Sequence, residues 1–261
     1  MVPFAARMRV VILTSARHGL ASACLPALAA APGVEVIAVV HVLGHYKSRW
    51  TKLRRDLRKA WRIGPLGVLT GLALRPLYLA APGEDLYEVA ARHGVPVRTS
   101  PRTNAPETVA LLREAGCDLA LSLGNGYIAR RVFSIPRHGM LNLHGEILPD
   151  FQGAASVMWQ IYEGRAETGF TIHQVDEHFD TGAILYVERF PITFEASFAD
   201  TVRNNMQESN RRIPAAMAEV VSHYDAYLAR AQAQKAGRLY TTPSLSEYLR
   251  MLRQHRRLAR K

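Results

Sequence analysis

An alternation of short apolar runs with helical segments dominates the first half of the chain and constrains its fold more than any other feature. Apolar runs occupy residues 8–14 (MRVVILT) and 34–40, and residues 19–31 between them have the composition of a helix. The alternation continues as helix, run, helix and run at 84–93, 95–98, 107–115 and 118–123. Strands joined by helices in this order pair in parallel. We therefore expect an α/β fold of the Rossmann-like kind, with a mostly parallel twisted sheet flanked by helices.

The turns after two of these strands argue against one class of ligand. The turn at 15–19 (SARHG) and the turn at 124–126 (GNG) both contain glycine, but neither matches G-x-G-x-x-G. A dinucleotide site is therefore not expected.

Three side chains in the middle of the chain indicate acyl transfer to an amine. Asn142 and His144 lie in LNLHGEILPDFQG (141–153), and Asp180 lies in VDEHFDTG (175–182). Side chains alternate along a strand, so Asn142 and His144 should project from one face of an extended segment. Attack on a formyl carbon creates an oxyanion, which requires a hydrogen-bond donor, a proton-transfer group and a carboxylate that orients this group. Asn142, His144 and Asp180 supply one of each, so we expect an enzyme.

The longer pattern resembles a known family. The run N-x-H-x4-P-x3-G at 142–153 precedes a predicted helix, then ETGFTIH (167–173) and DTG (180–182). This pattern resembles the formyltransferases that use 10-formyltetrahydrofolate, and the resemblance is specific over residues 118–192. It implies the formyltransferase fold, with 10-formyltetrahydrofolate as co-substrate. It also implies that three residues are catalytic: Asn142, His144 and Asp180.

Two positions depart from the family pattern. Gly145-Glu146 stands where the family usually has Pro-Ser after the catalytic His, and Gln152 stands where a basic or polar residue is common before the final Gly. Contacts with the acceptor are therefore expected to differ. Glu146 either meets the acceptor amine or is a solvated loop carboxylate.

The turn at 124–128 follows a strand at its carboxyl end, where open α/β sheets place their ligands. The resemblance implies that this turn and the loop before Asp180 line a folate pocket. Glycines allow close approach to the pterin ring, although an ordinary strand-to-helix turn is the alternative. The expected cofactor-binding residues are Gly124, Asn125, Gly126, Tyr127, Ile128, Val175, Asp176 and Glu177.

Composition indicates a cytoplasmic protein that needs no disulfide or metal for its stability. The chain has 261 residues, of which 48% are hydrophobic, so it can bury a large core. Cys24 and Cys117 lack paired spacing and are interpreted as reduced thiols. The N-terminal apolar run is too short for a signal peptide.

The formal net charge of +11 is concentrated in two segments. Lys47–Arg62 holds eight basic residues against one acidic residue, and Arg250–Lys261 holds six basic residues and no acidic one. Basic runs attract phosphates, RNA or anionic lipid, although a solvated face is the ordinary alternative. Contact with nucleic acid or with an anionic membrane through these two segments is therefore one expectation.

Residues 42–82 form an unusual insertion. A basic stretch with Trp50 and Trp61 is followed by the nearly apolar IGPLGVLTGLALRPLYLA. The glycines and prolines disfavour a transmembrane helix. Three alternatives remain: a subdomain over the edge of the active site, an interfacial segment on anionic lipid, or a dimer contact. A homodimer is a further expectation, because the long helix after Ser197 and the insertion both offer apolar surface; the alternative is that each packs internally.

The last third of the chain is expected to be helical. A long helix over 197–227 should bury an apolar stripe, a loop follows at 237–243, and a basic helix begins at the Ser244 cap and runs to 258. The stripe comprises Met206, Ile213, Met217, Val220 and Val221. We place a catalytic domain at 1–225, with the insertion at about 42–82, and a basic C-terminal tail at 226–261.

The acceptor is assigned by elimination within the family. The loop at 14–19 lacks the G-x-G-S-N of glycinamide ribonucleotide formyltransferases. No segment resembles the β-barrel domain of methionyl-tRNA formyltransferases, and there is no room before Met8 for the N-terminal domain of deformylases. We therefore expect an amino sugar on a nucleotide-linked carrier. The alternatives are a methionyl-tRNA or glycinamide ribonucleotide formyltransferase, a formyltetrahydrofolate hydrolase, and a non-catalytic scaffold that binds RNA or membrane.

Overall fold

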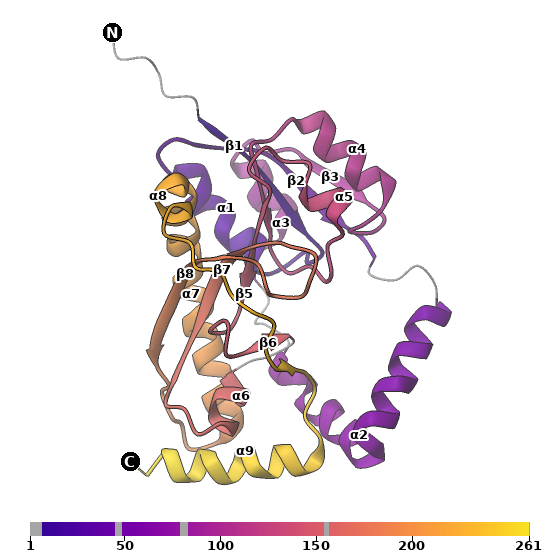
Figure 1. Cartoon of the computed structure of the whole chain (residues 1–261), viewed down its shortest axis with the longest axis vertical. Coiled ribbons are helices and arrows are strands. Elements are labelled where there is room, and N and C mark those ends of the chain that lie inside the picture. The colour runs from indigo at the N-terminus through magenta and orange to yellow at the C-terminus, as the bar shows by residue number, and fades with distance from the viewer. Residues whose placement is uncertain (1–6, 45–48, 79–82, 154–156, 261) are drawn as a thin grey trace.

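A computed structural model of the chain describes residues 7–44, 49–78, 83–153 and 157–260. These residues include a seven-stranded sheet with the strand order β3-β2-β1-β4-β5-β7-β8 (Figure 1). The parallel strands are β1 (Met8–Thr14), β2 (Val34–Val42), β3 (Val97–Ser100), β4 (Leu119–Ser122) and β5 (Met140–His144). Two antiparallel strands, β7 (Glu167–Gln174) and β8 (Ile184–Pro191), extend the sheet beyond β5. The expected α/β fold with a mostly parallel sheet is confirmed.

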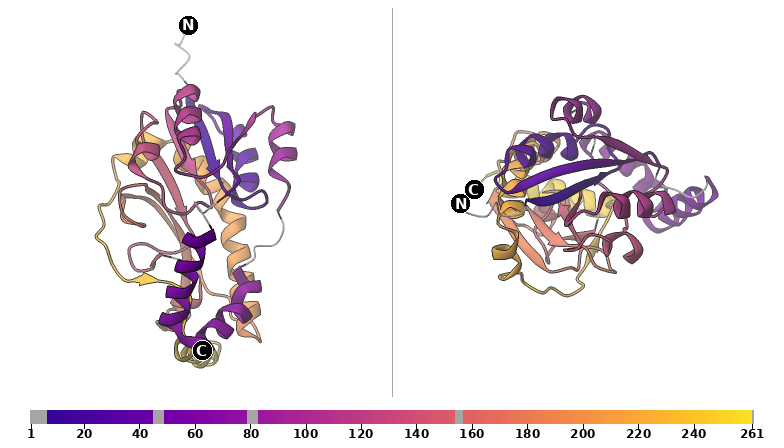
Figure 2. Two further views of the ribbon diagram at one scale, coloured as in Figure 1. Left: turned by 90° about the vertical axis from the view of Figure 1, so that its right-hand side faces the viewer. Right: turned by 90° about the horizontal axis from the view of Figure 1, so that it is seen from above.

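Helices cover both faces of the sheet (Figure 2). One face packs against α1 (Leu20–Ala30), α3 (Leu86–Arg92) and α7 (Phe198–Ser222). The other face packs against α4 (Pro106–Ala115) and α5 (Arg130–Phe133). Alternation along β1 explains the two layers, because Val10 and Ile12 enter the first core whereas Val11 and Leu13 enter the second.

The long helix predicted over 197–227 is two helices. α7 ends at Ser222, and the short α8 (Tyr224–Leu228) begins after His223, whose backbone (φ −115, ψ 33) leaves the helical region. The predicted apolar stripe of α7 is confirmed: Ile213, Met217, Val220 and Val221 are buried, and Met206 is partly buried.

A third core lies below the parallel strands in Figure 1. It contains side chains of α6 (Val157–Tyr162), α9 (Leu245–Leu258), the start of α7 and strand β9 (Leu239–Tyr240), which pairs with the short strand β6 (Gln152–Gly153). The segment 237–243, predicted to be a loop, therefore contains a short strand. Glycine permits this pairing, because a Cβ at Gly153 (φ 92) would lie 2.6 Å from the carbonyl oxygen of Tyr240.

The predicted cap of the last helix is confirmed. The Ser244 hydroxyl accepts a hydrogen bond from Glu247 N, and the Glu247 carboxylate accepts one from Ser244 N, which is a capping box. The domain boundary at residue 225 stays a prediction, although both β9 and α9 beyond it pack on earlier elements.

The insertion is largely helical. α2 (Arg49–Tyr78) is kinked at Gly64, where the backbone (φ 69, ψ 172) is non-helical, and it contacts α7 and α9. Lys47, which belongs to the predicted basic segment, lies outside the described residues, as does Lys261. No helix in the described part of the chain is both long enough and apolar enough to cross a bilayer.

Candidate active site

Strand β5 places Asn142 and His144 on one face of the sheet, as predicted. Asn142 lies opposite His173 and His144 lies opposite Thr171 on the antiparallel strand β7. Residues that face one another across a ladder project to the same side. The polar side chains of Asn142, His144, Thr171 and His173 therefore form one patch where β5 ends.

Asp180 reaches this patch from a tight loop after β7. Its own φ is 54, a left-handed value that is uncommon outside glycine. Three contacts hold the loop: the Asp176 carboxylate accepts a hydrogen bond from Thr181 Oγ1 at 2.7 Å, Gly153 N donates to Asp180 Oδ2 at 2.9 Å, and Gln152 Nε2 donates to Asp180 O at 3.1 Å. The carboxylate is therefore fixed by the backbone of β6 as well as by its own loop.

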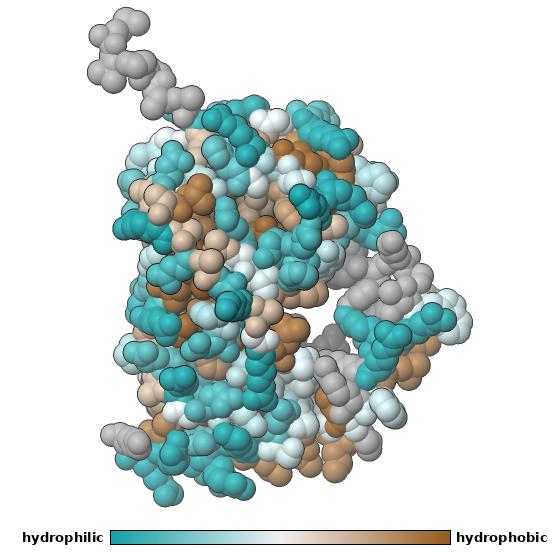
Figure 3. All heavy atoms as spheres, viewed as in Figure 1, coloured by the Kyte–Doolittle hydropathy of each residue, from teal (hydrophilic) through white to brown (hydrophobic). Residues whose placement is uncertain are grey.

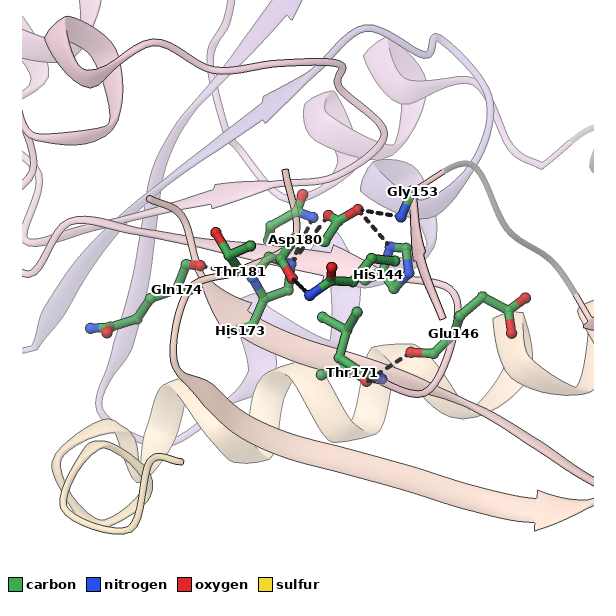
Figure 4. Close-up of polar contacts among 12 residues, drawn as sticks. His144, Glu146, Gly153, Thr171, His173, Gln174, Asp180 and Thr181 are labelled. Atoms are coloured by element: carbon green, nitrogen blue, oxygen red, sulfur yellow. Dashed lines mark hydrogen bonds and ion pairs between the residues drawn. The ribbon is translucent and has the colours of Figure 1, made fainter. Parts of the chain in front are cut away.

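Asp180 lies between two imidazoles (Figure 4). Asp180 Oδ2 is 3.6 Å from His144 Nδ1, and Asp180 Oδ1 is 3.7 Å from His173 Nε2. His144 Nε2 is 2.7 Å from the Phe151 carbonyl oxygen. A carbonyl oxygen can only accept, so Nε2 carries a proton. The nitrogen of His144 that can exchange a proton is therefore Nδ1, which faces Asp180.

His173 fixes the orientation of Asn142. Burial lowers the pKa of His173 from 6.5 to about 4, against the opposing effect of Asp180, so this imidazole is neutral at pH 7. His173 Nδ1 donates to Gln174 O at 2.7 Å, which leaves Nε2 as an acceptor for Asn142 Nδ2 at 3.1 Å. The Asn142 amide nitrogen is thereby held in place, and its second N–H can donate a hydrogen bond to a ligand in the site.

We did not predict a role for His173 from the sequence, although a signal was present. In the strand ETGFTIHQ, the apolar Phe170 and Ile172 alternate with the polar Thr171 and His173. All four are buried. Buried polar side chains need hydrogen-bond partners, so a buried strand with one polar face indicates that another polar element lies against it. Here that element is the neighbouring strand, which carries Asn142 and His144.

A cavity of about 300 Å³ opens beside this patch. Asn142, His144 and Asp180 all line it. Seven of the eight residues expected to bind the co-substrate line it too: Gly124, Asn125, Gly126, Tyr127, Ile128, Val175 and Asp176. Glu177 does not; it is exposed and pairs with Arg130 at 2.8 Å. Lining residues that we did not predict from the sequence are Leu143, Gly153, His173, His178 and Phe179.

The cavity has the features of a site for a flat heterocycle with N–H donors. Asn125 Nδ2 donates to Leu13 O at 2.7 Å, whereas Asn125 Oδ1 is buried and accepts no hydrogen bond from the described residues. The rings of Tyr127 and Phe179 pack 5.4 Å apart in the cavity wall. A buried acceptor beside aromatic walls suits a pterin ring, so the residues present fit the expected co-substrate.

Glu146 is not a solvated loop carboxylate; that alternative is wrong. Its exposed fraction is 1%, and Gln160 Nε2 donates to its carboxyl group. The chain turns inward because Thr171 Oγ1 donates to Glu146 O at 2.7 Å. Burial raises the pKa of Glu146 well above its usual value. The side chain lines a small cavity of about 100 Å³ together with Gly145, Thr168 and Ser209, so the alternative that it meets the acceptor stays open.

Known proteins share both sequence and fold with the chain. It is 43% identical over 100 residues to the methionyl-tRNA formyltransferase of Sorangium cellulosum, over 38% of this chain and 32% of that protein. It is 32% identical over 139 residues to that of Thermosynechococcus vestitus, over 50% of this chain and 42% of that protein. The chain therefore matches less than half of the length of these relatives.

Solved structures share the fold at low sequence identity. A phosphoribosylglycinamide formyltransferase from Bacillus halodurans superposes with a TM-score of 0.56 at 22% identity, over 83% of this chain and 96% of that chain. An N-formyltransferase from Helicobacter canadensis, in complex with folinic acid and dTDP-3-aminofucose, superposes with a TM-score of 0.53 at 15% identity. The superposition covers 92% of this chain and 72% of that chain. The family model described as formyl transferase matches residues 80–221, more than half of the chain. The chain belongs to the formyl transferase family.

Proposed function

We propose that the chain transfers a formyl group from 10-formyltetrahydrofolate to a primary amine. The observation that carries the proposal is the convergence of Asn142, His144 and Asp180 on one wall of a cavity that fits the co-substrate. When bound, 10-formyltetrahydrofolate supplies the activated formyl group. The residues of the chain then have to orient the reactants, stabilise the charge that develops, and accept a proton.

Asn142 is suited to stabilise negative charge on the acyl oxygen. One N–H of its amide is committed to His173 Nε2, and this hydrogen bond sets the direction of the other. A donor held in place before the reaction contributes more than one that must reorganise. His173 is thus a positioning residue in this proposal, and Asn142 is the group that touches the reacting atoms.

His144 is suited to take the proton of the attacking amine and to return it to the folate nitrogen as the bond between that nitrogen and the formyl carbon breaks, so that tetrahydrofolate leaves. Its Nε2 is occupied by the Phe151 carbonyl, so the proton is accepted at Nδ1. The imidazolium that forms is then stabilised by Asp180 Oδ2, 3.6 Å away. Asp180 keeps its position because Gly153 N donates to the same oxygen.

For the acceptor we propose an amino sugar on a nucleotide-linked carrier. The loop at 14–19, which lacks the glycine-rich sequence of the glycinamide ribonucleotide enzymes, supports this choice over that substrate. Methionyl-tRNA is the second candidate, because the relatives of highest identity given above bear that name.

The test is an assay of tetrahydrofolate release from 10-formyltetrahydrofolate, with products weighed by mass spectrometry. Each reaction contains one acceptor: a nucleotide-linked amino sugar, methionyl-tRNA, glycinamide ribonucleotide, or none. An acceptor heavier by one formyl group supports the proposal and identifies the substrate. Release that does not depend on an acceptor indicates a hydrolase instead, and no release with any acceptor contradicts formyl transfer.

A further inference from the structure

Residues 49–63, the first half of α2, form an arm that stands away from the sheet (Figures 1 and 2). The kink at Gly64 separates the arm from the second half of the helix, which lies against the body. A Cβ at Gly71 would lie 3.1 Å from Thr242 Cγ2, so this second half packs closely against the segment that leads into α9. The arm is thus an exposed helix on an anchored base.

The arm carries a stripe of large apolar side chains in contact with solvent. Trp50, Leu53, Leu57 and Trp61 are spaced by three, four and four residues, which places them on one face of a helix. The exposed fractions of the two tryptophans are 72% and 91%. Burying these four side chains in an apolar phase would be strongly favourable.

Basic side chains flank this apolar face. Arg54 and Arg58 are exposed, and their spacing of four residues places them side by side along the stripe. In sequence, residues 49–63 hold seven basic residues and one acidic residue. Figure 3 shows hydrophilic and hydrophobic atoms side by side on this edge of the molecule.

A second basic helix lies at the same end of the molecule. α9 contacts α2, and both lie at the lower end in Figure 1. α9 buries Met251, His255 and Leu258 against the body. Its exposed side carries Arg250, Arg253, Arg256, Arg257 and Arg260.

We propose that the arm is an interfacial anchor that lies on an anionic phospholipid membrane, with α9 adding electrostatic attraction at the same end. Tryptophan favours the headgroup region, leucine favours the acyl boundary beneath it, and arginine pairs with lipid phosphates. Leu53 and Leu57 distinguish this partner from RNA, whose phosphates offer no apolar phase. A second copy of the chain is disfavoured, because it would bring one arm of net charge +6 against another.

The first test is flotation of the full chain with phosphatidylcholine vesicles and with vesicles that also contain about 30% phosphatidylglycerol. We expect binding to the anionic vesicles to exceed binding to the neutral ones by about tenfold or more, since each basic side chain near the surface adds attraction. The double variant Trp50→Ala/Trp61→Ala and the double variant Arg54→Glu/Arg58→Glu should each lose about tenfold. The matched charge control is Arg98→Glu/Arg113→Glu, at exposed positions of β3 and α4, and it should lose much less.

The second test locates the contact while binding is intact. Vesicles with brominated acyl chains quench tryptophan that enters the membrane. We expect quenching in the unaltered chain and its loss in Trp50→Phe/Trp61→Phe, which retains only Trp159, a buried residue.

Several results would overturn the proposal. One is equal binding to neutral and anionic vesicles, or none to either. Another is an equal loss in the Arg98→Glu/Arg113→Glu control, which would assign the attraction to overall charge. Binding to a short RNA duplex in place of vesicles would identify a nucleic acid as the partner. Dimerisation in sedimentation velocity that Trp50→Ala/Trp61→Ala abolishes would identify a second copy.

Discussion

Asp180 and Glu146 are two buried or nearly buried carboxyl groups close to the end of β5, and their surroundings differ sharply. Asp180 Oδ2 accepts the Gly153 N–H and lies 3.6 Å from His144, and its other oxygen lies 3.7 Å from His173. Glu146 has the Gln160 amide as its side-chain partner and an environment that raises its pKa.

The difference separates a carboxylate equipped for proton transfer from a carboxyl group equipped to stay neutral. A protonated Glu146 could donate to Gln160 Oε1, which is buried and has no partner among the described residues. The pair would then be satisfied as two neutral groups. Asp180, by contrast, lies beside His144 Nδ1, the nitrogen of that imidazole that is not bound to a carbonyl. Four experiments test this contrast and the residues that surround Asp180.

The largest effect is expected from Asp180→Asn. The amide retains an oxygen that can accept from Gly153 N but removes the charge that stabilises protonated His144. We expect the turnover number to fall by about 100- to 10,000-fold, with the melting temperature little changed. A rate within tenfold of the unaltered chain, measured with the acceptor that supports transfer, would show that the charge of Asp180 does not serve the reaction.

The second effect concerns the free energy of unfolding at acidic pH. The pKa of His173 is about 4 in the folded chain, below its usual value of 6.5, so the unfolded chain binds more protons between these values. This contribution to stability is fully present above pH 6.5 and is lost as the pH falls toward 4, by about 3 kcal/mol at most. Denaturant unfolding at pH 7 and pH 4.5 should show a larger loss for the unaltered chain than for His173→Gln. Equal losses would contradict a buried neutral His173.

The third effect concerns the positioning of Asn142. His173→Leu removes the acceptor for the Asn142 amide, so we expect the turnover number to fall by about tenfold, the equivalent of one hydrogen bond of about 1.4 kcal/mol. His173→Gln offers an amide oxygen in its place and should restore part of the rate. If both variants turn over equally, Asn142 does not depend on His173.

The smallest effect is expected from Glu146→Gln. This substitution keeps the shape and removes the titrating group, so turnover should stay within about threefold and stability at pH 8 should not decrease. The sign follows from the raised pKa: a buried carboxyl group must ionise at a cost as the pH rises, and glutamine avoids that cost. A loss of a hundredfold in turnover would instead place Glu146 in contact with the acceptor amine. Glu146 and Asp180 would then both serve the reaction, which would contradict the contrast drawn above.

Local patterns predicted the parallel part of the sheet and half of the site. Outside the insertion, the order of strands and helices over 8–123 follows from apolar runs, because each element buries its own run. The shared face of Asn142 and His144 follows from strand alternation alone. These features depend on neighbours in sequence, which is why they could be predicted without the structure.

The remaining features depend on contacts between distant segments. Asp180 reaches His144 through a left-handed residue and through a hydrogen bond from Gly153, and neither follows from the spacing of 36 residues between them. Only the family resemblance indicated that pairing. The burial of Glu146 does not follow from its neighbours in sequence, because the inward turn of its loop depends on Thr171 of another strand.

The pairing of β6 with β9 has a consequence for the order of events during synthesis. Gly153, whose N–H holds Asp180, lies in a strand whose partner is Tyr240, and Gln152 is bound by the backbone at Lys235 and Gly237. A ribosome adding about 5–20 residues per second needs on the order of ten seconds to pass from the first strand to the second. Asp180 is itself added during that interval, 60 residues before Tyr240. The strand pairing that holds Gly153, and with it the alignment of the Asp180 carboxylate, can therefore form only after β9 has been made.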